Sequence, residues 1–127
     1  PSARLVSMEL GPPTIVEALP KETRRELSDI TRVIASLVSA QSELIQRETR
    51  LTESQTEATR GTTGVATATL DRVVTELSEA KLASSKKREE IAAALERLRL
   101  ELIRLRSGVG TVAEVRAESD RAKNLIG

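Results

Sequence analysis

The clearest apolar repeat in the chain lies in IAAALERLRLELIRLRSGVGTV, residues 91–112. Its main apolar positions recur at alternating intervals of four and three residues, at Ile91, Leu95, Leu98, Leu102, Leu105, Val109 and Val112. A repeat of 3.5 residues places one apolar stripe along a helix, where it can face a partner helix. The stretch therefore predicts helices that pack as coiled coils do.

The composition of the whole chain favours the same class of fold. The 127 residues include no Phe, Tyr or Trp, while 39% are hydrophobic and 31% are charged. A core must then be built from Leu, Ile, Val and Ala, which interdigitate along helical seams, whereas strands favour aromatic residues. We expect an all-α fold and disfavour all-β folds.

Breaks in the apolar pattern divide the chain into three segments. Residues 1–20 should form an irregular N-terminal segment with a short helical turn, since their apolar residues show no clear period. Residues 21–107 should form an antiparallel hairpin of two long helices, with a turn near 60–64, where Arg60-Gly-Thr-Thr-Gly64 weakens helix formation. Residues 108–127 should contain a kink and a short C-terminal helix. One continuous helix through residues 60–64 remains the alternative to a turn.

Three sequence patterns mark expected helix starts. Each is a Thr followed three residues later by a Glu, the spacing of a capping box, in which the two side chains satisfy N–H groups of the first turn. The pairs are Thr14 with Glu17, Thr23 with Glu26, and Thr111 with Glu114.

The two long helices show matching patterns when the chain is folded about residues 62 and 63. Leu27 then lies opposite Leu98, and the polar Gln41 lies opposite the polar Ser84. Apolar positions meet apolar positions, as a helical hairpin requires. The predicted interaction seam comprises Leu27, Ile30, Ile34, Leu37, Leu44, Leu51, Ile91, Leu95, Leu98, Leu102 and Leu105.

Further apolar residues lie off this seam and widen the apolar stripe. A stripe wider than two rows is typical of bundles of three or four helices. We therefore expect coiled-coil or four-helix-bundle packing on oligomerisation, or packing against a different protein. The off-seam residues are Val33, Val38, Ile45, Leu82, Leu100 and Ile103.

Catalytic chemistry has little support in this sequence. The chain contains no His, Cys or Tyr, so the commonest proton carriers and nucleophiles are missing. The adjacent Glu89 and Glu90 have no third ligand at a usable spacing, and a solvated pair is the simpler interpretation. We predict no enzyme activity, no catalytic residue, no cofactor and no metal site. The compartment is left open.

A basic cluster in the second long helix provides a possible charged surface. Residues 81–106 hold eight basic and four acidic side chains, although the whole chain has a net charge of only +1. Such a cluster could follow a phosphate backbone or anionic lipid headgroups. The same side chains could equally be a solvated face with local ion pairs. The residues concerned are Lys86, Lys87, Arg88, Arg97 and Arg104.

Three functional hypotheses follow. The leading one is a non-enzymatic structural or assembly module that uses long helical faces for self-association or for binding other subunits of a larger complex. The first alternative is a signal-relay or sensor bundle, in which the polar seam positions form loosely packed layers that shift between arrangements. The second alternative is a basic helical surface for nucleic acid or anionic lipid, which the near-neutral total charge makes the least favoured partner class.

Overall fold

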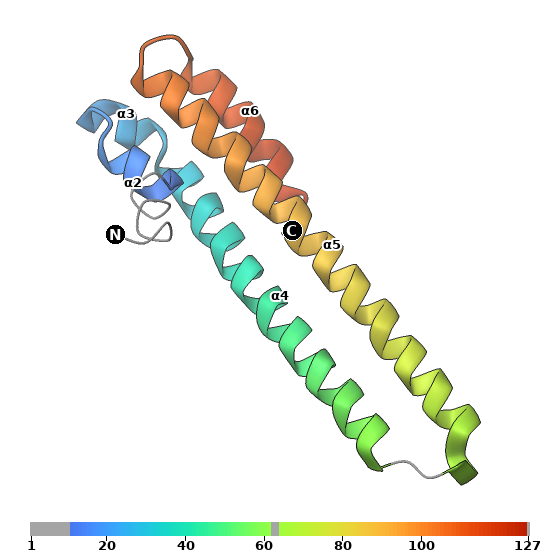
Figure 1. Cartoon of the computed structure of the whole chain (residues 1–127). Helices are drawn as coiled ribbons and strands as arrows, with labels where there is room; N and C mark the ends of the chain where they lie inside the picture. Colours follow the sequence, from blue (N-terminus) through green and yellow to red (C-terminus); the bar gives the residue numbers. More distant parts are fainter. Residues whose placement is uncertain (1–10, 62–63, 127) are drawn as a thin grey trace. The chain divides into compact units, whose positions relative to one another are not determined.

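The computed structural model describes residues 11–61 and 64–126, apart from the side chain of Val65, and Figure 1 shows the elements. No strand occurs in this part of the chain, so the all-α expectation is confirmed. The elements in chain order are the helices α2 (Pro12–Glu17), α3 (Lys21–Glu26) and α4 (Ser28–Gly61), the 3₁₀ turn η1 (Gly64–Ala66), and the helices α5 (Thr67–Arg106) and α6 (Val112–Lys123).

The chain forms two compact units. One comprises residues 1–39 and 90–127 and is called the terminal unit; the other, Ala40–Glu89, is called the central unit. Both long helices, α4 and α5, contribute residues to each unit. The predicted turn falls partly on residues 62 and 63, and half of the predicted irregular segment falls on residues 1–10; these lie outside the described residues. On either side of the turn, α4 ends at Gly61 and η1 begins at Gly64.

The terminal unit has a closed aliphatic core. In α4, α5 and α6 the buried side chains recur at intervals of three and four residues and so fall on one face of each helix. Helix α3 (KETRRE) contributes no buried residue. Full burial of a Leu or Ile side chain is worth about 1.5–3 kcal/mol, so this core holds most of the packing energy. The buried apolar residues are Ile15, Val16, Leu19, Leu27, Ile30, Val33, Ile34, Leu37, Ile91, Ala94, Leu98, Leu102, Val115 and Ala122.

The central unit is thinly packed by comparison. Among its described residues Ser84 alone is buried, and the predicted seam residues Leu44 and Leu51 are only half-buried. The Ser84 hydroxyl donates to the carbonyl oxygen of Leu44 at 3.3 Å, and the Gln55 side-chain amide donates to the Ser78 hydroxyl at 2.7 Å. Residue numbers rise along α4 as they fall along α5 between these contacts, so the two helices run antiparallel here.

The observed pairing differs in detail from the one predicted by folding the sequence. Ser84 was expected opposite Gln41, but its hydroxyl meets the Leu44 carbonyl, three residues further along α4. In the terminal unit Leu95 is half-buried, whereas its neighbour Ala94 is fully buried. Arg97, three residues after Ala94 on the same side of α5, pairs with Glu118 of α6 at 2.5 Å, so we infer that α6 covers the side that carries Ala94.

Two of the three predicted capping boxes are wrong. Helix α2 begins at Pro12 with Gly11 as its N-cap, so Thr14 lies inside the helix, and α3 begins at Lys21 with Pro20 as its N-cap. Proline has the φ angle of a first helical turn and needs no N–H partner there, which moves these starts upstream. A break at Leu27 (φ −99°, ψ 10°), which the apolar pattern does not reveal, separates α3 from α4.

Half of the third capping box is confirmed, and the chain reverses just before it. Thr111 is the N-cap of α6, and its side chain accepts a hydrogen bond from the Glu114 N–H at 3.2 Å. The Glu114 carboxylate accepts from the Thr111 hydroxyl at 3.1 Å rather than from a backbone N–H. Upstream, Gly108 has φ +81°, a left-handed conformation that glycine adopts without strain. The N–H groups of Val109 and Gly110 then both donate to the carbonyl oxygen of Arg104, at 3.0 and 3.1 Å. The chain therefore turns back into a short C-terminal helix and does not continue α5.

Candidate interaction surfaces

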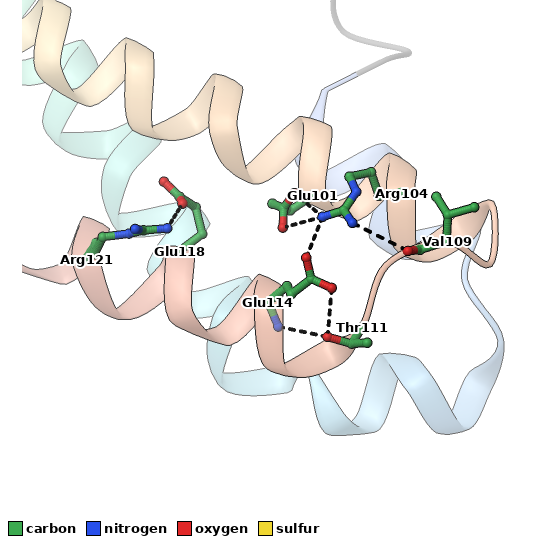
Figure 2. Close-up of polar contacts among 7 residues, drawn as sticks. All are labelled: Glu101, Arg104, Val109, Thr111, Glu114, Glu118 and Arg121. Atoms are coloured by element: carbon green, nitrogen blue, oxygen red, sulfur yellow. Dashed lines mark hydrogen bonds and ion pairs between the residues drawn. The ribbon is translucent and has the colours of Figure 1, made fainter.

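An ion-pair network fastens the start of α6 to the end of α5 (Figure 2). The Arg104 guanidinium donates to Glu101 at 2.8 Å, to Glu114 at 2.5 Å and to the Val109 carbonyl at 3.4 Å. Together with the Thr111 hydroxyl, Arg104 holds the pKa of the Glu114 carboxyl below its usual range, and the two carboxylates raise the pKa of Arg104. The network holds α6 against α5 within the terminal unit, so its role is structural.

A second set of pairs holds the middle of α6. The Glu118 side chain is 5% exposed and accepts from Arg97 at 2.5 Å and from Arg121. Arg116 pairs with Asp29 at 2.6 Å and donates to the Glu26 carbonyl at 2.8 Å, which ties α6 to the region where α3 gives way to α4. The Arg116 guanidinium lowers the pKa of the Asp29 carboxyl. These contacts hold α6 against α5 and against the region where α3 gives way to α4, all within the terminal unit.

The predicted basic surface is largely neutralised within the chain. Arg88 pairs with Glu48 at 2.7 Å, and Arg97 and Arg104 take part in the pairs described above. Lys86 is exposed and Lys87 is half-buried, and in the described part of the chain neither has an ion pair. Three of the five cations proposed to meet phosphate are therefore already matched by carboxylates of their own unit.

The predicted interaction seam is divided between the two units. Seven of its residues are buried in the terminal unit, where they form the chain's own core and are not available to a partner: Leu27, Ile30, Ile34, Leu37, Ile91, Leu98 and Leu102. Leu95 and Leu105 are half-buried in the same unit. Leu44 and Leu51 are half-buried in the central unit, where the incomplete core leaves room for a partner.

The largest apolar exposure in the central unit lies beside the seam. Ile45 on α4 is 50% exposed and Leu82 on α5 is 72% exposed. Ile45 follows the seam residue Leu44 by one position. Leu82 follows Lys81, which lies on the α5 row that continues from Leu77 to Ser84 at the same three-and-four spacing. In an antiparallel helix pair, a step of one residue, about 100°, turns toward the same side on both helices. Ile45 and Leu82 therefore share one side of the α4–α5 pair.

We call the uncharged middle of this side the neutral face; beyond it, α5 carries Asp71 and Glu89 on the same side. Open grooves border it: Leu82, Ser78 and Ser85 line one with Glu48, Gln55 and Lys81, and Thr56 and Thr59 line another with Gln55, Arg60 and Val74. The neutral face comprises Ser42, Ile45, Thr49, Thr52, Thr56 and Thr59 of α4 and Thr75, Ser78, Leu82 and Ser85 of α5; all are exposed except Ser85, which is half-buried. Sequence reasoning flagged Ile45 and Leu82 singly but missed the threonines that join them.

The described residues show no other class of site. Within residues 11–61 and 64–126, no three acidic side chains are grouped in a way that could hold a metal ion. None of the helices in these ranges is long and apolar enough to span a bilayer.

Comparison with known proteins yields no relative. No family model, curated protein or solved structure matches the chain.

Proposed function

We propose that the chain is a non-enzymatic assembly module whose central-unit helices associate with another helical surface, from copies of itself or from other subunits of a larger complex. The observation that carries this proposal is the contrast between the two units. The terminal unit closes a core of fourteen buried apolar residues, whereas the described part of the central unit buries Ser84 alone.

The energetics of the central unit support the need for a partner. Helical segments of this length are marginal in water unless an apolar face is packed. Here the seam residues Leu44 and Leu51 keep part of their surface in water, and Ile45 and Leu82 are at least half exposed. Covering these four side chains would contribute about 1 kcal/mol or more for each.

The two alternative functions remain predictions with weaker support. A relay bundle would use soft polar layers, but Ser84, Gln55 and Arg88 each make a cross-helix hydrogen bond in the central unit. A nucleic-acid or lipid surface would need cations that are available, and Arg88 is engaged by Glu48.

Hydrogen exchange at two protein concentrations tests the proposal. At low concentration, amides of 42–60 and 67–88 should exchange faster than those of the terminal core, because few apolar contacts cover them. Raising the concentration should slow exchange in the central unit and leave the terminal unit unchanged. Strong protection of the central unit in a chain of monomeric mass, independent of concentration, would show that it needs no partner.

A further inference from the structure

We propose that the neutral face is the contact surface of a two-fold symmetric dimer, in which the α4–α5 pairs of two copies form a four-helix bundle over the central unit. This inference rests on the proposed function and specifies its partner as a second copy of this chain. Four features of the neutral face carry it: the distribution of charge, the spacing of its residues, the state of its hydroxyl groups and its area.

Charge is segregated between the two sides of α4. The ten residues of the neutral face include no charged side chain, in a chain that is 31% charged. The positions of α4 that precede the seam by one residue lie on the opposite side, and four of these six are charged: Glu43, Arg47, Arg50 and Glu57. On α5 the uncharged row from Thr75 to Ser85 is bounded on the same side by Asp71 and Glu89.

The spacing along α4 is that of a second seam. From Ile45 the neutral positions continue through Thr49, Thr52, Thr56 and Thr59, at intervals of four, three, four and three residues. A stripe with this period stays on one side of the helix and can follow a partner helix along its length. All five side chains are β-branched, so they are stiff and lose little rotamer freedom on packing.

The threonine hydroxyls on this stripe already have acceptors. Each donates to the carbonyl oxygen four residues upstream: Thr49 to Ile45 at 3.2 Å, Thr52 to Glu48 at 3.0 Å, Thr56 to Thr52 at 3.1 Å and Thr59 to Gln55 at 2.9 Å. A polar group is costly to bury when its donor is left unpaired. These four residues can therefore be removed from water with no donor orphaned, and they present their methyl groups to a partner.

The size of the neutral face suits a weak, reversible dimer. The face runs about 27 Å along α4, from Ser42 to Thr59, and about 16 Å along α5, from Thr75 to Ser85; at a helix width of about 10 Å it covers roughly 430 Å² in projection. Two copies would then bury roughly 860 Å² in projection, which lies near the lower end of specific interfaces.

A second copy is the occupant that fits this surface. In a two-fold interface each copy contributes the same patch, so the patch must be complementary to itself. A patch carrying charge of one sign would repel its own copy, whereas an uncharged patch that holds the four bonded threonines, Ile45 and Leu82 meets an identical one without an unpaired charge. A strongly basic or acidic partner would find no counter-charge on it.

The test compares charge placed on the two sides of α4. The double variant Thr52→Glu, Thr56→Glu puts four carboxylates into the dimer contact, and its control is Ser54→Glu, on the opposite side of the same helix. Both changes replace an exposed residue with one of higher helix propensity, so neither should reduce helicity, which circular dichroism verifies. Sedimentation measures the dimerisation constant at neutral pH. We expect it to weaken by at least about 100-fold in the double variant and by less than about threefold in the control.

Three results decide the inference. A dimer that is lost in the double variant and kept in the control supports it. A dimer that persists in the double variant overturns the neutral face as the contact but leaves the proposed assembly function standing. A chain that is monomeric at all concentrations overturns the second copy as the occupant, and if its central unit is also fully protected from hydrogen exchange, the proposed function fails as well.

Discussion

Truncating two leucines of the same predicted seam row should have unequal effects. Leu37 and Leu51 both lie on α4, separated by two heptads, and the apolar pattern treats them as equivalent. In the structure Leu37 is 0% exposed in the terminal unit, and Leu51 is half-buried in the central unit. Replacing each with Ala therefore compares the fully buried core of the terminal unit with the partly exposed core of the central unit.

The expected magnitudes follow from burial. Removing a fully buried Leu side chain loses its transfer free energy and leaves a cavity, so Leu37→Ala should lower the local stability by about 3 kcal/mol. Leu51 already keeps part of its surface in water, and water can enter the space left behind. We expect Leu51→Ala to cost about 1 kcal/mol or less in the dilute chain.

Native-state hydrogen exchange is the suitable assay, because two units need not unfold together and a single melting transition would mix them. Opening free energies are read at amides of residues 30–37 for one variant and 44–58 for the other, at a concentration where the chain is dilute. Equal losses for the two variants would contradict the contrast between a closed terminal core and a thin central one.

Three further predictions concern the terminal unit. Gly110→Ala should destabilise α6 by about 1–3 kcal/mol in urea denaturation, because the added Cβ would lie 3.0 Å from the Arg104 Cβ and 3.1 Å from a backbone nitrogen; Gly61→Ala, with nothing within 4 Å, is its control and should lose nothing. Glu118→Gln should speed hydrogen exchange in residues 115–122 by about tenfold, because the carboxylate accepts from two arginines. An unchanged exchange rate would show that Glu118 does not hold α6 in place. The folded chain lowers the pKa of the Asp29 and Glu114 carboxyls, so the stability that they add is present above the ordinary carboxyl range and is lost as the pH falls through the lowered values, below about pH 4. Circular dichroism should show this acid loss shrinking in Asp29→Asn, Glu114→Gln, and an unaltered acid profile would argue against it.

Periodicity predicted the helices well because helical burial depends on a pattern that a sequence displays directly. The interval of three and four residues from Ile91 onward identified α5, and the glycines and Thr111 marked where α6 begins. Side-chain spacing alone could not show that α6 turns back onto α5. We infer that this packing covers Ala94, and no property of Ala94 by itself distinguishes it from its neighbours.

The candidate surface was harder to predict from sequence for a physical reason. Threonine counts as a polar residue when a sequence is read alone. Only the structure shows that the hydroxyls of Thr52 and Thr56 donate to carbonyl oxygens of their own helix. Likewise, Arg88 and Arg97 counted as available cations until their partners Glu48 and Glu118 were located, 40 and 21 residues away in the sequence. Long-range pairing of this kind leaves no local signal.

Sedimentation equilibrium of the unmodified chain over a wide concentration range tests whether two copies associate through the neutral face. The monomer mass is 13.8 kDa. A central unit that associates through its neutral face predicts a reversible rise toward twice that mass as the concentration increases, with no larger species, because a two-fold contact closes on itself. A constant mass of 13.8 kDa at every concentration, or growth into species beyond the dimer, would contradict the two-fold dimer.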